Sequence, residues 1–296
     1  MPAVLVVFIL CLAVPASSDA AIAAREADTL VYRAAAGEAN RVDVSQDGGR
    51  VTFAERPETR GTARAPLLAG TGCEGEATVA CDAAGIRHVR VELGDESDVA
   101  SLSDPGRSLA IDAVIEGGAG NDQLQGGAGN DSVLGGIHSD TLLDSAGADF
   151  FDGGAGSLDR IEYRTVEPLR ISLDGVADDG RAGEGDDVDA SVEDVAGGAG
   201  PDTIVGSAKK NQLLGGGGDD VMNGGGGGDR VRGHDGDDRL TGGAGEDLLD
   251  GAAGDDLLLG RDGERDKIAC RAGPADRASV DRRDRVYSGC ERVRTR

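Results

Sequence analysis

Large aromatic side chains are almost absent from this 296-residue chain, which has no Trp, three Tyr and four Phe. A globular core of this length normally uses more of them, because each buries a large apolar area. The composition therefore argues against a conventional globular core.

Basic residues are scarce too: 30 Lys and Arg stand against 55 Asp and Glu, for a formal net charge of −25. The phosphates of nucleic acids and of anionic membranes would repel such a chain, so we expect no nucleic-acid partner. Cation binding is the natural use of this charge. Because crowded carboxylates repel one another, we also expect metal binding and folding to be coupled.

Motifs for catalysis are missing as well. The chain has no H-E-x-x-H, no G-x-S-x-G and no Gly-Lys-Ser/Thr phosphate loop. Its three histidines, His88, His138 and His234, are far apart in the sequence. Carboxylates are too abundant for any one pair to stand out as acid and base. We therefore expect no enzymatic activity.

Glycine, by contrast, is abundant, with 50 residues, and it recurs in register. Cut every nine residues from Gly197, the stretch Gly197–Asp266 gives units that begin with Gly. Six units carry Asp at the sixth position: Asp202, Asp220, Asp229, Asp238, Asp247 and Asp256. The eighth position is apolar in the first seven units: Ile204, Leu213, Met222, Val231, Leu240, Leu249 and Leu258. A second array, Gly117–Ile161, repeats the pattern with Asp122, Asp131, Asp140 and Asp149.

This pattern, G-G-x-G-x-D-x-U-x with U apolar, resembles the RTX (haemolysin-type) calcium-binding nonapeptide repeat. The resemblance implies an all-β fold, a parallel β-roll (RTX β-solenoid) in two arrays. The apolar residue would lie in a short x-U-x strand, and two units would complete one coil. Glycines would form the turns, because glycine adopts positive φ at little cost.

The resemblance also implies Ca²⁺ as the bound ion, held by carboxylates and turn carbonyls of coils two units apart. Asp202 would neighbour Asp220, Asp220 would neighbour Asp238, and Asp229 would neighbour Asp247. We predict ten metal ligands: Asp122, Asp131, Asp140, Asp149, Asp202, Asp220, Asp229, Asp238, Asp247 and Asp256. The alternative is a flexible acidic linker. The recurring apolar residue opposes it, although without calcium the disordered alternative would apply.

The apolar run Val4–Val14 is too short to span a bilayer as a mature helix. It predicts a secretory signal peptide over residues 1–20, although no Lys or Arg precedes it; a buried core strand is the alternative. Of the five cysteines, Cys11 would leave with this peptide. The other four allow three pairings, and proximity favours Cys73–Cys81 and Cys270–Cys290. A zinc site is the rival, but no C-x-x-C occurs and no His is near either pair.

We expect six segments. They are the signal peptide (1–20), an N-terminal β domain that covers the first coil (21–116), a first array (117–162), a β spacer with an acidic loop (163–196), a second array (197–268) and a disulfide-closed C-terminal cap (269–296). In the spacer, Asp178, Asp179, Asp186 and Asp187 could hold another ion, but a solvated loop is the preferred interpretation. One extra residue before Asp159, and another before Asp266, predict bulges that end the regular coil.

The sequence thus predicts a secreted, extracellular, non-enzymatic calcium-binding β-roll protein whose fold depends on the ion, with no stable membrane span in the mature chain. Two alternatives remain open. The chain could be an adhesin or surface-interaction module that binds an unknown partner through residues 21–116, or the RTX tail of an enzyme.

Overall fold

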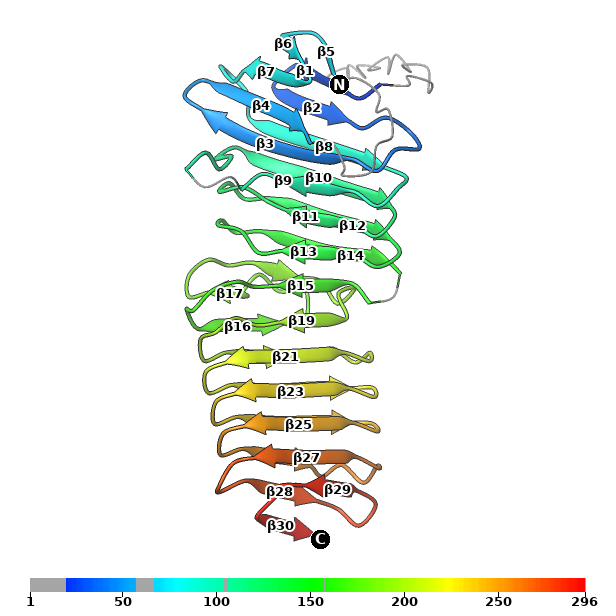
Figure 1. The fold of residues 1–296 in the computed structure, drawn as a ribbon, viewed down its shortest axis with the longest axis vertical. Helices are drawn as coiled ribbons and strands as arrows, with labels where there is room; N and C mark the ends of the chain where they lie inside the picture. Colours follow the sequence, from blue (N-terminus) through cyan, green and yellow to red (C-terminus); the bar gives the residue numbers. More distant parts are fainter. Residues whose placement is uncertain (1–19, 57–66, 104–105, 157, 296) are drawn as a thin grey trace, which may run out of the picture.

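The computed structural model describes residues 20–56, 67–103, 106–156 and 158–295. Every regular element in these ranges is a strand, and the strands stack into a long, narrow body with the first and last described strands at opposite poles (Figure 1). Residues 1–19, and with them Val4–Val14 and Cys11, lie outside the described residues. Among the described residues, no helix is long and apolar enough to cross a membrane.

The N-terminal end is built mainly from antiparallel hairpins. Its strands are β1 (Ile22–Glu26), β2 (Thr29–Arg33), β3 (Arg41–Asp47), β4 (Arg50–Glu55), β5 (Leu68–Ala69), β6 (Cys73–Glu76) and β7 (Thr78–Asp82). A Cys73–Cys81 disulfide joins β6 to β7 at residues that face each other in the ladder. Two of the few aromatic rings, Tyr32 and Phe53, are buried here and stack with centroids 6.1 Å apart.

The hairpins pass into the roll through parallel pairing. The next strands are β8 (His88–Gly94), β9 (Val99–Ser101) and β10 (Asp112–Ala119). β8 pairs in parallel with β2 on one side and with β10 on the other, while β9 pairs with β3. The hairpins therefore cover the first coil, and two faces of the roll begin at β8 and β9.

The first array and the spacer continue both faces. Their strands are β11 (Gln123–Gln125), β12 (Ser132–Ile137), β13 (Thr141–Leu143), β14 (Phe150–Ala155), β15 (Arg160–Glu162), β16 (Leu169–Ser172), β17 (Gly180–Arg181), β18 (Asp187–Val188) and β19 (Asp194–Ala196). β15 stays in register with β13, with Ile161 opposite Leu142. The prediction that the extra residue ends the coil here is wrong, because the turn before β15 absorbs it.

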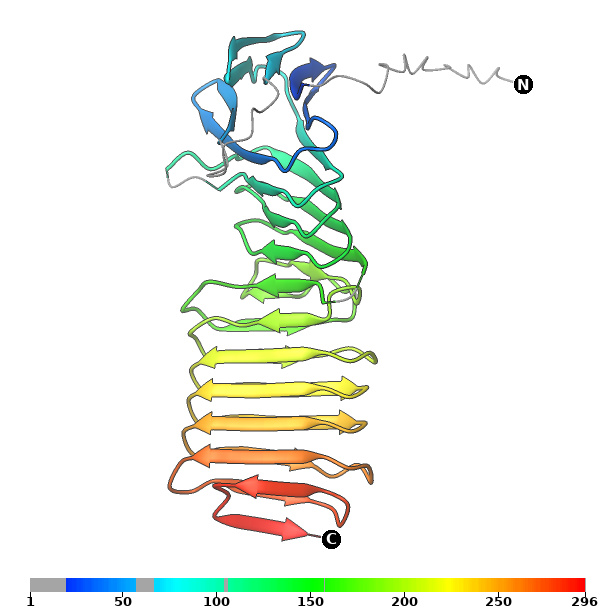
Figure 2. The same cartoon turned by 45° about the vertical axis from the view of Figure 1, so that its right-hand side comes forward.

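The second array is the most regular part of the roll (Figure 2). Its strands are β20 (Thr203–Val205), β21 (Gln212–Gly217), β22 (Val221–Gly226), β23 (Arg230–Asp235), β24 (Arg239–Ala244), β25 (Leu248–Ala253), β26 (Leu257–Gly260) and β27 (Lys267–Ala272). Each of β21 to β25 has six residues, more than the x-U-x expected. The strand runs into the next unit, where the first-position glycine also points inward.

The core of the second array lies between the two faces and consists of the eighth-position side chains. Leu213, Val231, Leu249 and Ile268 follow one another on one face, and Ile204, Met222, Leu240 and Leu258 on the other. All are at most 1% exposed. Ile268 lies opposite Leu249, so the extra residue before Asp266 does not end the coil either.

The C-terminal residues add further strands to the same faces. They are β28 (Arg277–Val280), β29 (Arg285–Ser288) and β30 (Arg292–Thr295), and they pair in parallel with β26, β27 and β28. A Cys270–Cys290 disulfide closes this end. The predicted all-β parallel roll and both disulfide pairings are confirmed.

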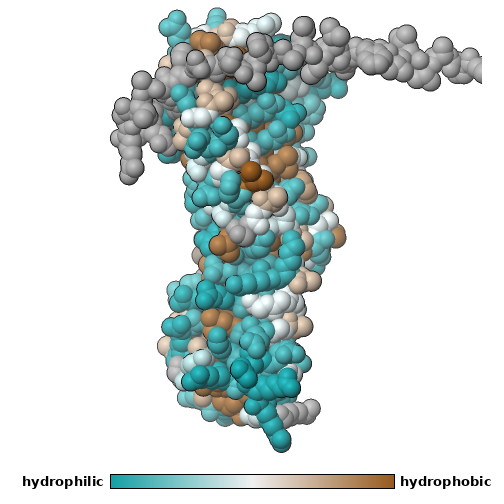
Figure 3. Space-filling view, turned by 90° about the vertical axis from the view of Figure 1, so that its right-hand side faces the viewer, coloured by the Kyte–Doolittle hydropathy of each residue, from teal (hydrophilic) through white to brown (hydrophobic). Residues whose placement is uncertain are grey.

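Hydrophilic residues dominate the side of the roll drawn in Figure 3, where apolar residues form small, separate groups. The exposed large apolar side chains lie on different elements and turns: Leu68, Ile137, Leu158, Val166, Val176, Val221, Tyr287 and Val293. These scattered apolar residues form no extended exposed patch among the described residues.

Candidate metal centre

The sixth-position aspartates form two columns, each made of alternate units 18 residues apart, which is one full coil. In one column the N–H of Asp202 donates to Asp220 Oδ1 at 2.8 Å, and the N–H of Asp220 donates to Asp238 Oδ1 at 2.9 Å. In the other, the N–H of Asp229 donates to Asp247 Oδ1 at 2.8 Å. The neighbours expected from the resemblance are the neighbours observed.

Most of these carboxylates leave one oxygen without a partner. Asp238 is 2% exposed; its Oδ1 accepts the N–H of Asp220, while its Oδ2 is buried with no donor. The same holds for Asp122, Asp140, Asp220, Asp229, Asp247 and Asp256. Burying a carboxylate oxygen without a partner costs folding free energy. A positively charged ligand at each of these atoms would offset that cost.

A carbonyl oxygen of the next coil lies beside the unpaired carboxylate oxygen. A Cβ placed on Gly224 would be 2.4 Å from both Asp229 Oδ2 and the carbonyl oxygen of Gly242. At Gly135 both corresponding distances, to Asp140 Oδ2 and to the Gly153 carbonyl, are 2.6 Å. The first-position glycine therefore keeps open a space beside these two oxygens. Carboxylate and carbonyl oxygens are the ligands that Ca²⁺ prefers, at 2.3–2.6 Å, so the donor set fits this ion.

The electrostatics of the columns favour cation binding. Burial raises the pKa of Asp220, Asp229 and Asp238 to about 7. The carboxylate of the next coil in the same column adds to this rise, for example Asp247 acting on Asp229. Backbone N–H donors oppose the rise without cancelling it. Near neutral pH these carboxyl groups are therefore only partly ionised, and a divalent cation would stabilise their charged form.

Comparison with known families gives four matches to the RTX calcium-binding nonapeptide repeat, over residues 112–142, 134–157, 196–231 and 232–264. The chain therefore contains RTX calcium-binding nonapeptide repeats. A search of curated proteins found no match. RTX repeats bind calcium, which supports Ca²⁺ as the ion of these columns. The aspartates of the columns would hold it with their Oδ2 atoms, and the ion would link successive coils.

Three of the ten predicted aspartates differ from the other RTX positions. Asp131 Oδ2 accepts the N–H of Gly127 at 2.5 Å, Asp202 Oδ2 accepts the N–H of Gly198 at 2.9 Å, and Asp149 Oδ2 accepts the Ser145 hydroxyl at 2.7 Å. These carboxylates lie in the columns but already have partners for both oxygens. At seven of the ten positions the carboxylate Oδ2 therefore has no hydrogen-bond donor, and at the other three it has one.

Five further aspartates join the columns and were not among the predicted ligands. They are Asp98, Asp159, Asp186, Asp266 and Asp276, each at most 1% exposed with an unpaired Oδ2. The extra residue displaced Asp159 and Asp266 from the sixth position of the repeat. Asp98 and Asp276 follow degenerate units that each keep only one glycine, Gly94 and Gly273, beside the Asp-x-Ala of Asp98–Ala100 and Asp276–Ala278.

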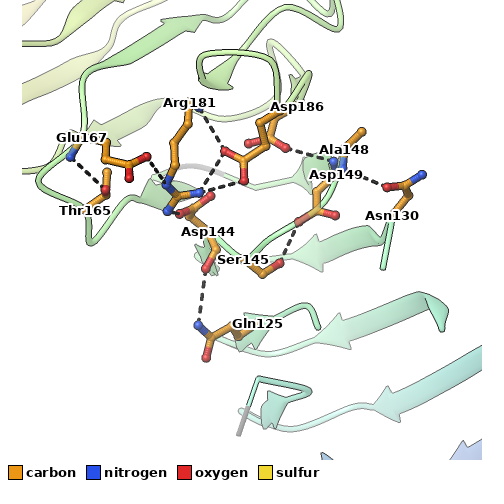
Figure 4. A network of polar contacts seen from close by, with 11 residues as sticks. Gln125, Asn130, Asp144, Ser145, Ala148, Asp149, Thr165, Glu167, Arg181 and Asp186 are labelled. Atoms are coloured by element: carbon orange, nitrogen blue, oxygen red, sulfur yellow. Dashed lines mark hydrogen bonds and ion pairs between the residues drawn. The ribbon is translucent and has the colours of Figure 1, made fainter. Parts of the chain in front are cut away.

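The acidic loop of the spacer is partly buried. Asp179 and Asp186 are 1% and 0% exposed, so the expectation of a solvated loop is wrong for them, while Asp178 is exposed. Asp179 accepts the N–H groups of Ser172 and Val188, which accounts for both of its oxygens. Asp186 lies beside Arg181 and other acidic side chains in a dense network (Figure 4).

Proposed function

We propose that this RTX-repeat chain is a secreted, non-enzymatic calcium-binding protein whose folding is coupled to calcium. The observation that carries the proposal is the pair of columns of buried aspartates, in which unpaired Oδ2 atoms face carbonyl oxygens. In a chain of net charge −25, these oxygens are a favourable site for a cation and an unfavourable one for an anion.

The apolar core is too small to drive folding alone. It takes one aliphatic side chain or Met from each nine-residue unit, while the order imposed on many glycines is entropically costly. A cation that binds only the folded state makes up the difference. Each site filled to ten times its dissociation constant contributes about 1.4 kcal/mol, and many sites act together.

Export is supported by the disulfides and by the chemistry of the sites. Cys73–Cys81 and Cys270–Cys290 need an oxidising compartment. Calcium sites of extracellular modules typically have dissociation constants of about 10⁻⁴–10⁻³ M. The signal peptide predicted at residues 1–20 agrees with both observations.

The absence of enzymatic activity is supported by how the titratable groups are distributed. In the part of the chain that the structure describes, most carboxylates of raised pKa recur along two columns, as Asp140, Asp220 and Asp238 do. Catalytic sites concentrate such groups at one place with a nucleophile or a base. The repeated arrangement fits ion binding instead.

The proposal is tested by circular dichroism of the purified full chain. In chelator the β signal should be weak, and calcium should restore it cooperatively at about millimolar concentration, within the range of extracellular sites. Magnesium should substitute poorly, because it demands near-ideal octahedral geometry. A spectrum that is the same in chelator and in calcium would contradict the coupling of folding to calcium. Mass spectrometry of the exported chain tests removal of residues 1–20.

A further inference from the structure

One face of the roll is interrupted at the spacer, between the two arrays. β18 ends the run of strands that includes β14, and β16 begins the run that includes β20. The antiparallel strand β17 covers the other side of β16. The loop from β17 to β18, residues 182–186, lies against the segment that follows β13 (Figure 4).

Three carboxylates meet at this interruption. One ligand oxygen each of Asp144, Glu184 and Asp186 lie within 4.8 Å of one another. Asp186 Oδ1 accepts the N–H of Asp149 at 3.0 Å, so Asp186 takes the place of a repeat aspartate in its column. Asp144 follows β13, and Glu184 comes from the loop of the spacer. The cluster therefore brings together the first array and the spacer.

Arg181 neutralises part of this charge. Its guanidinium contacts Asp144, and its Nη1 donates to Glu184 Oε1 at 2.8 Å and to Oε2 at 2.9 Å. With all groups ionised, three carboxylates and one guanidinium leave a net charge of −2. Arg181 donates neither to Asp144 Oδ1 nor to Asp186 Oδ2, and both oxygens are buried without a partner.

A neighbouring phenol provides independent evidence for a polar ligand site. Tyr163, which follows β15, is 2% exposed, yet its hydroxyl has no hydrogen-bond partner. Burial raises the pKa of Tyr163 well above its usual value, and the nearby carboxylates of Asp186 and Asp144 raise it further. A buried hydroxyl beside buried carboxylate oxygens, all without partners, indicates space for a shared ligand or water.

We propose that Asp144, Glu184 and Asp186 bind a divalent cation, calcium, at the interruption between the two arrays. Two oxygens bound to one calcium at 2.3–2.6 Å are at most about 4.6–5.2 Å apart, and these three oxygens, which lie within 4.8 Å of one another, satisfy the upper limit. The site lies outside the nonapeptide pattern, and only Asp186 belongs to a column. Its preference for calcium over other divalent ions rests on the proposed function.

Such an ion would fasten the spacer loop to the first array where the ladder on that face is broken. The other face is continuous, since β19 pairs with both β15 and β21. The ion would thus complete the connection between the arrays, so that calcium folds them as one unit.

Terbium(III) is a suitable probe, because it occupies calcium sites and emits when a nearby tyrosine is excited. The chain has no Trp and three Tyr, so excitation reaches few sites. In the full chain, Tyr163→Phe should remove a distinct part of the sensitised emission that calcium displaces from the wild type. This variant removes only a hydroxyl without a partner, so the fold should persist.

Glu184→Gln gives the affinity readout, since the amide keeps the shape of the side chain. It should raise the terbium concentration needed for the Tyr163-dependent emission about tenfold, because fewer charged ligands weaken such sites. Asp178→Asn, in the same loop but exposed, is the matched control and should leave the emission unchanged. Circular dichroism in calcium verifies that each variant is folded.

The outcomes separate this site from the repeat sites. Tyr163-dependent emission that Glu184→Gln weakens and Asp178→Asn preserves supports the site. Equal emission from wild type and Tyr163→Phe, in a chain that calcium still folds, overturns it and leaves the proposed function intact; Arg181 alone then satisfies the cluster. A chain whose β signal ignores calcium contradicts the proposed function instead, and Tyr163-dependent terbium emission in that chain would still support a cation site here.

Discussion

Asn211 shows what the carboxylate contributes at a column position. It occupies the place of a sixth-position Asp and is 1% exposed. Its Oδ1 accepts the N–H of Ser207 at 2.8 Å, its Nδ2 donates to the Glu193 carbonyl at 2.9 Å, and its N–H donates to Asp229 Oδ1 at 2.8 Å. An amide is therefore fully satisfied in this coil, so its geometry does not require Asp. The charge of the other positions needs a different explanation, and a cation provides it.

Replacing a column carboxylate by its amide should have opposite effects without and with calcium. In Asp229→Asn, the new Nδ2 would face the Gly242 carbonyl that now lies beside Asp229 Oδ2. In chelator we expect stabilisation of about 1–3 kcal/mol, because an unpaired buried charge is removed. In calcium the midpoint of the titration should move upward, because a charged ligand is lost.

Thermal unfolding and calcium titration, both followed by circular dichroism, measure these effects. Asp235→Asn makes the same change in charge at an exposed turn residue and serves as the control. Loss of stability of Asp229→Asn in chelator would contradict the interpretation of the unpaired oxygen.

Sequence reasoning located the column residues where the glycines kept the register and missed them where it failed. The nine-residue period placed all ten predicted aspartates at buried turn positions. It missed Asp98 and Asp276, because each of their turns keeps only one glycine, Gly94 or Gly273, and the nine-residue register is lost. The period also could not predict which carboxylates have a hydrogen-bond donor at Oδ2. The Oδ2 bonds of Asp131, Asp149 and Asp202 depend on the local path of the turn, which the period does not encode.

At the scale of the strand, the side chains of β24 alternate between core and solvent. Leu240 in β24 is fully buried between Met222 and Leu258, while Arg239 beside it is exposed. Leu240→Asn should cost about 3–5 kcal/mol in calcium, since it removes apolar contacts and buries an unpaired amide. Arg239→Asn should change stability by no more than about 0.5 kcal/mol. Chemical denaturation in calcium tests both variants, and equal stabilities would show that the core register is misassigned.

At the scale of the turn, glycine is required by the stacking of coils as well as by φ. Gly236 has φ 135°, and an added Cβ would be 2.0 Å from the carbonyl oxygen of Gly218 in the coil before it. Gly263 has φ 94°, but an added Cβ would meet nothing within 4 Å. Both turns need positive φ, and only the first is confined by backbone.

Gly236→Ala should therefore prevent calcium from restoring full β signal, because adjacent turns cannot approach. Gly263→Ala should cost only the strain of its φ, about 1–3 kcal/mol, and should keep a near-normal titration. Circular dichroism titration compares the two. Similar behaviour would mean that φ alone, and not the stacking of turns, requires glycine at Gly236.

The sequence predicted which residues form strands better than it predicted where the coil ends. Leu249 and Ile268 pair despite the extra residue between their units, because an exposed turn lengthens without disturbing the ladder. The residues after Ile268 lack the glycine pattern, yet β28 and β30 extend the same face. Parallel hydrogen bonding to the edge of an existing strand therefore stabilises these strands where the local sequence lacks the repeat pattern.

Over the whole molecule, acid should stabilise the chain in the absence of calcium. Burial raises the pKa of Asp140 to about 6, of Asp220 to about 7 and of Asp186 to about 8, against about 3.9 in an unfolded chain. The folded state thus binds protons more tightly than the unfolded state. Its extra stability is fully present below about pH 3.9 and is lost as the pH rises through about 6–8.

In chelator, the β signal should accordingly grow as the pH is lowered from about 8 to about 5. In calcium the trend should reverse, since protons compete with the ion for the same oxygens and the titration midpoint rises in acid. Parallel pH series of circular dichroism spectra measure both trends. A β signal in chelator that declines with acid would contradict the buried, unpaired carboxylates.

The coil of 18 residues, in which each strand pairs only with its neighbours above and below, has a mechanical consequence. Pulled from its two ends, such a stack would yield from a terminus one coil at a time. Each step would release 18 residues, or about 6 nm of slack at 3.3–3.6 Å per residue. The ion between two coils would set the force at which they part. The calcium concentration around the molecule would then determine whether it resists extension or lengthens under force.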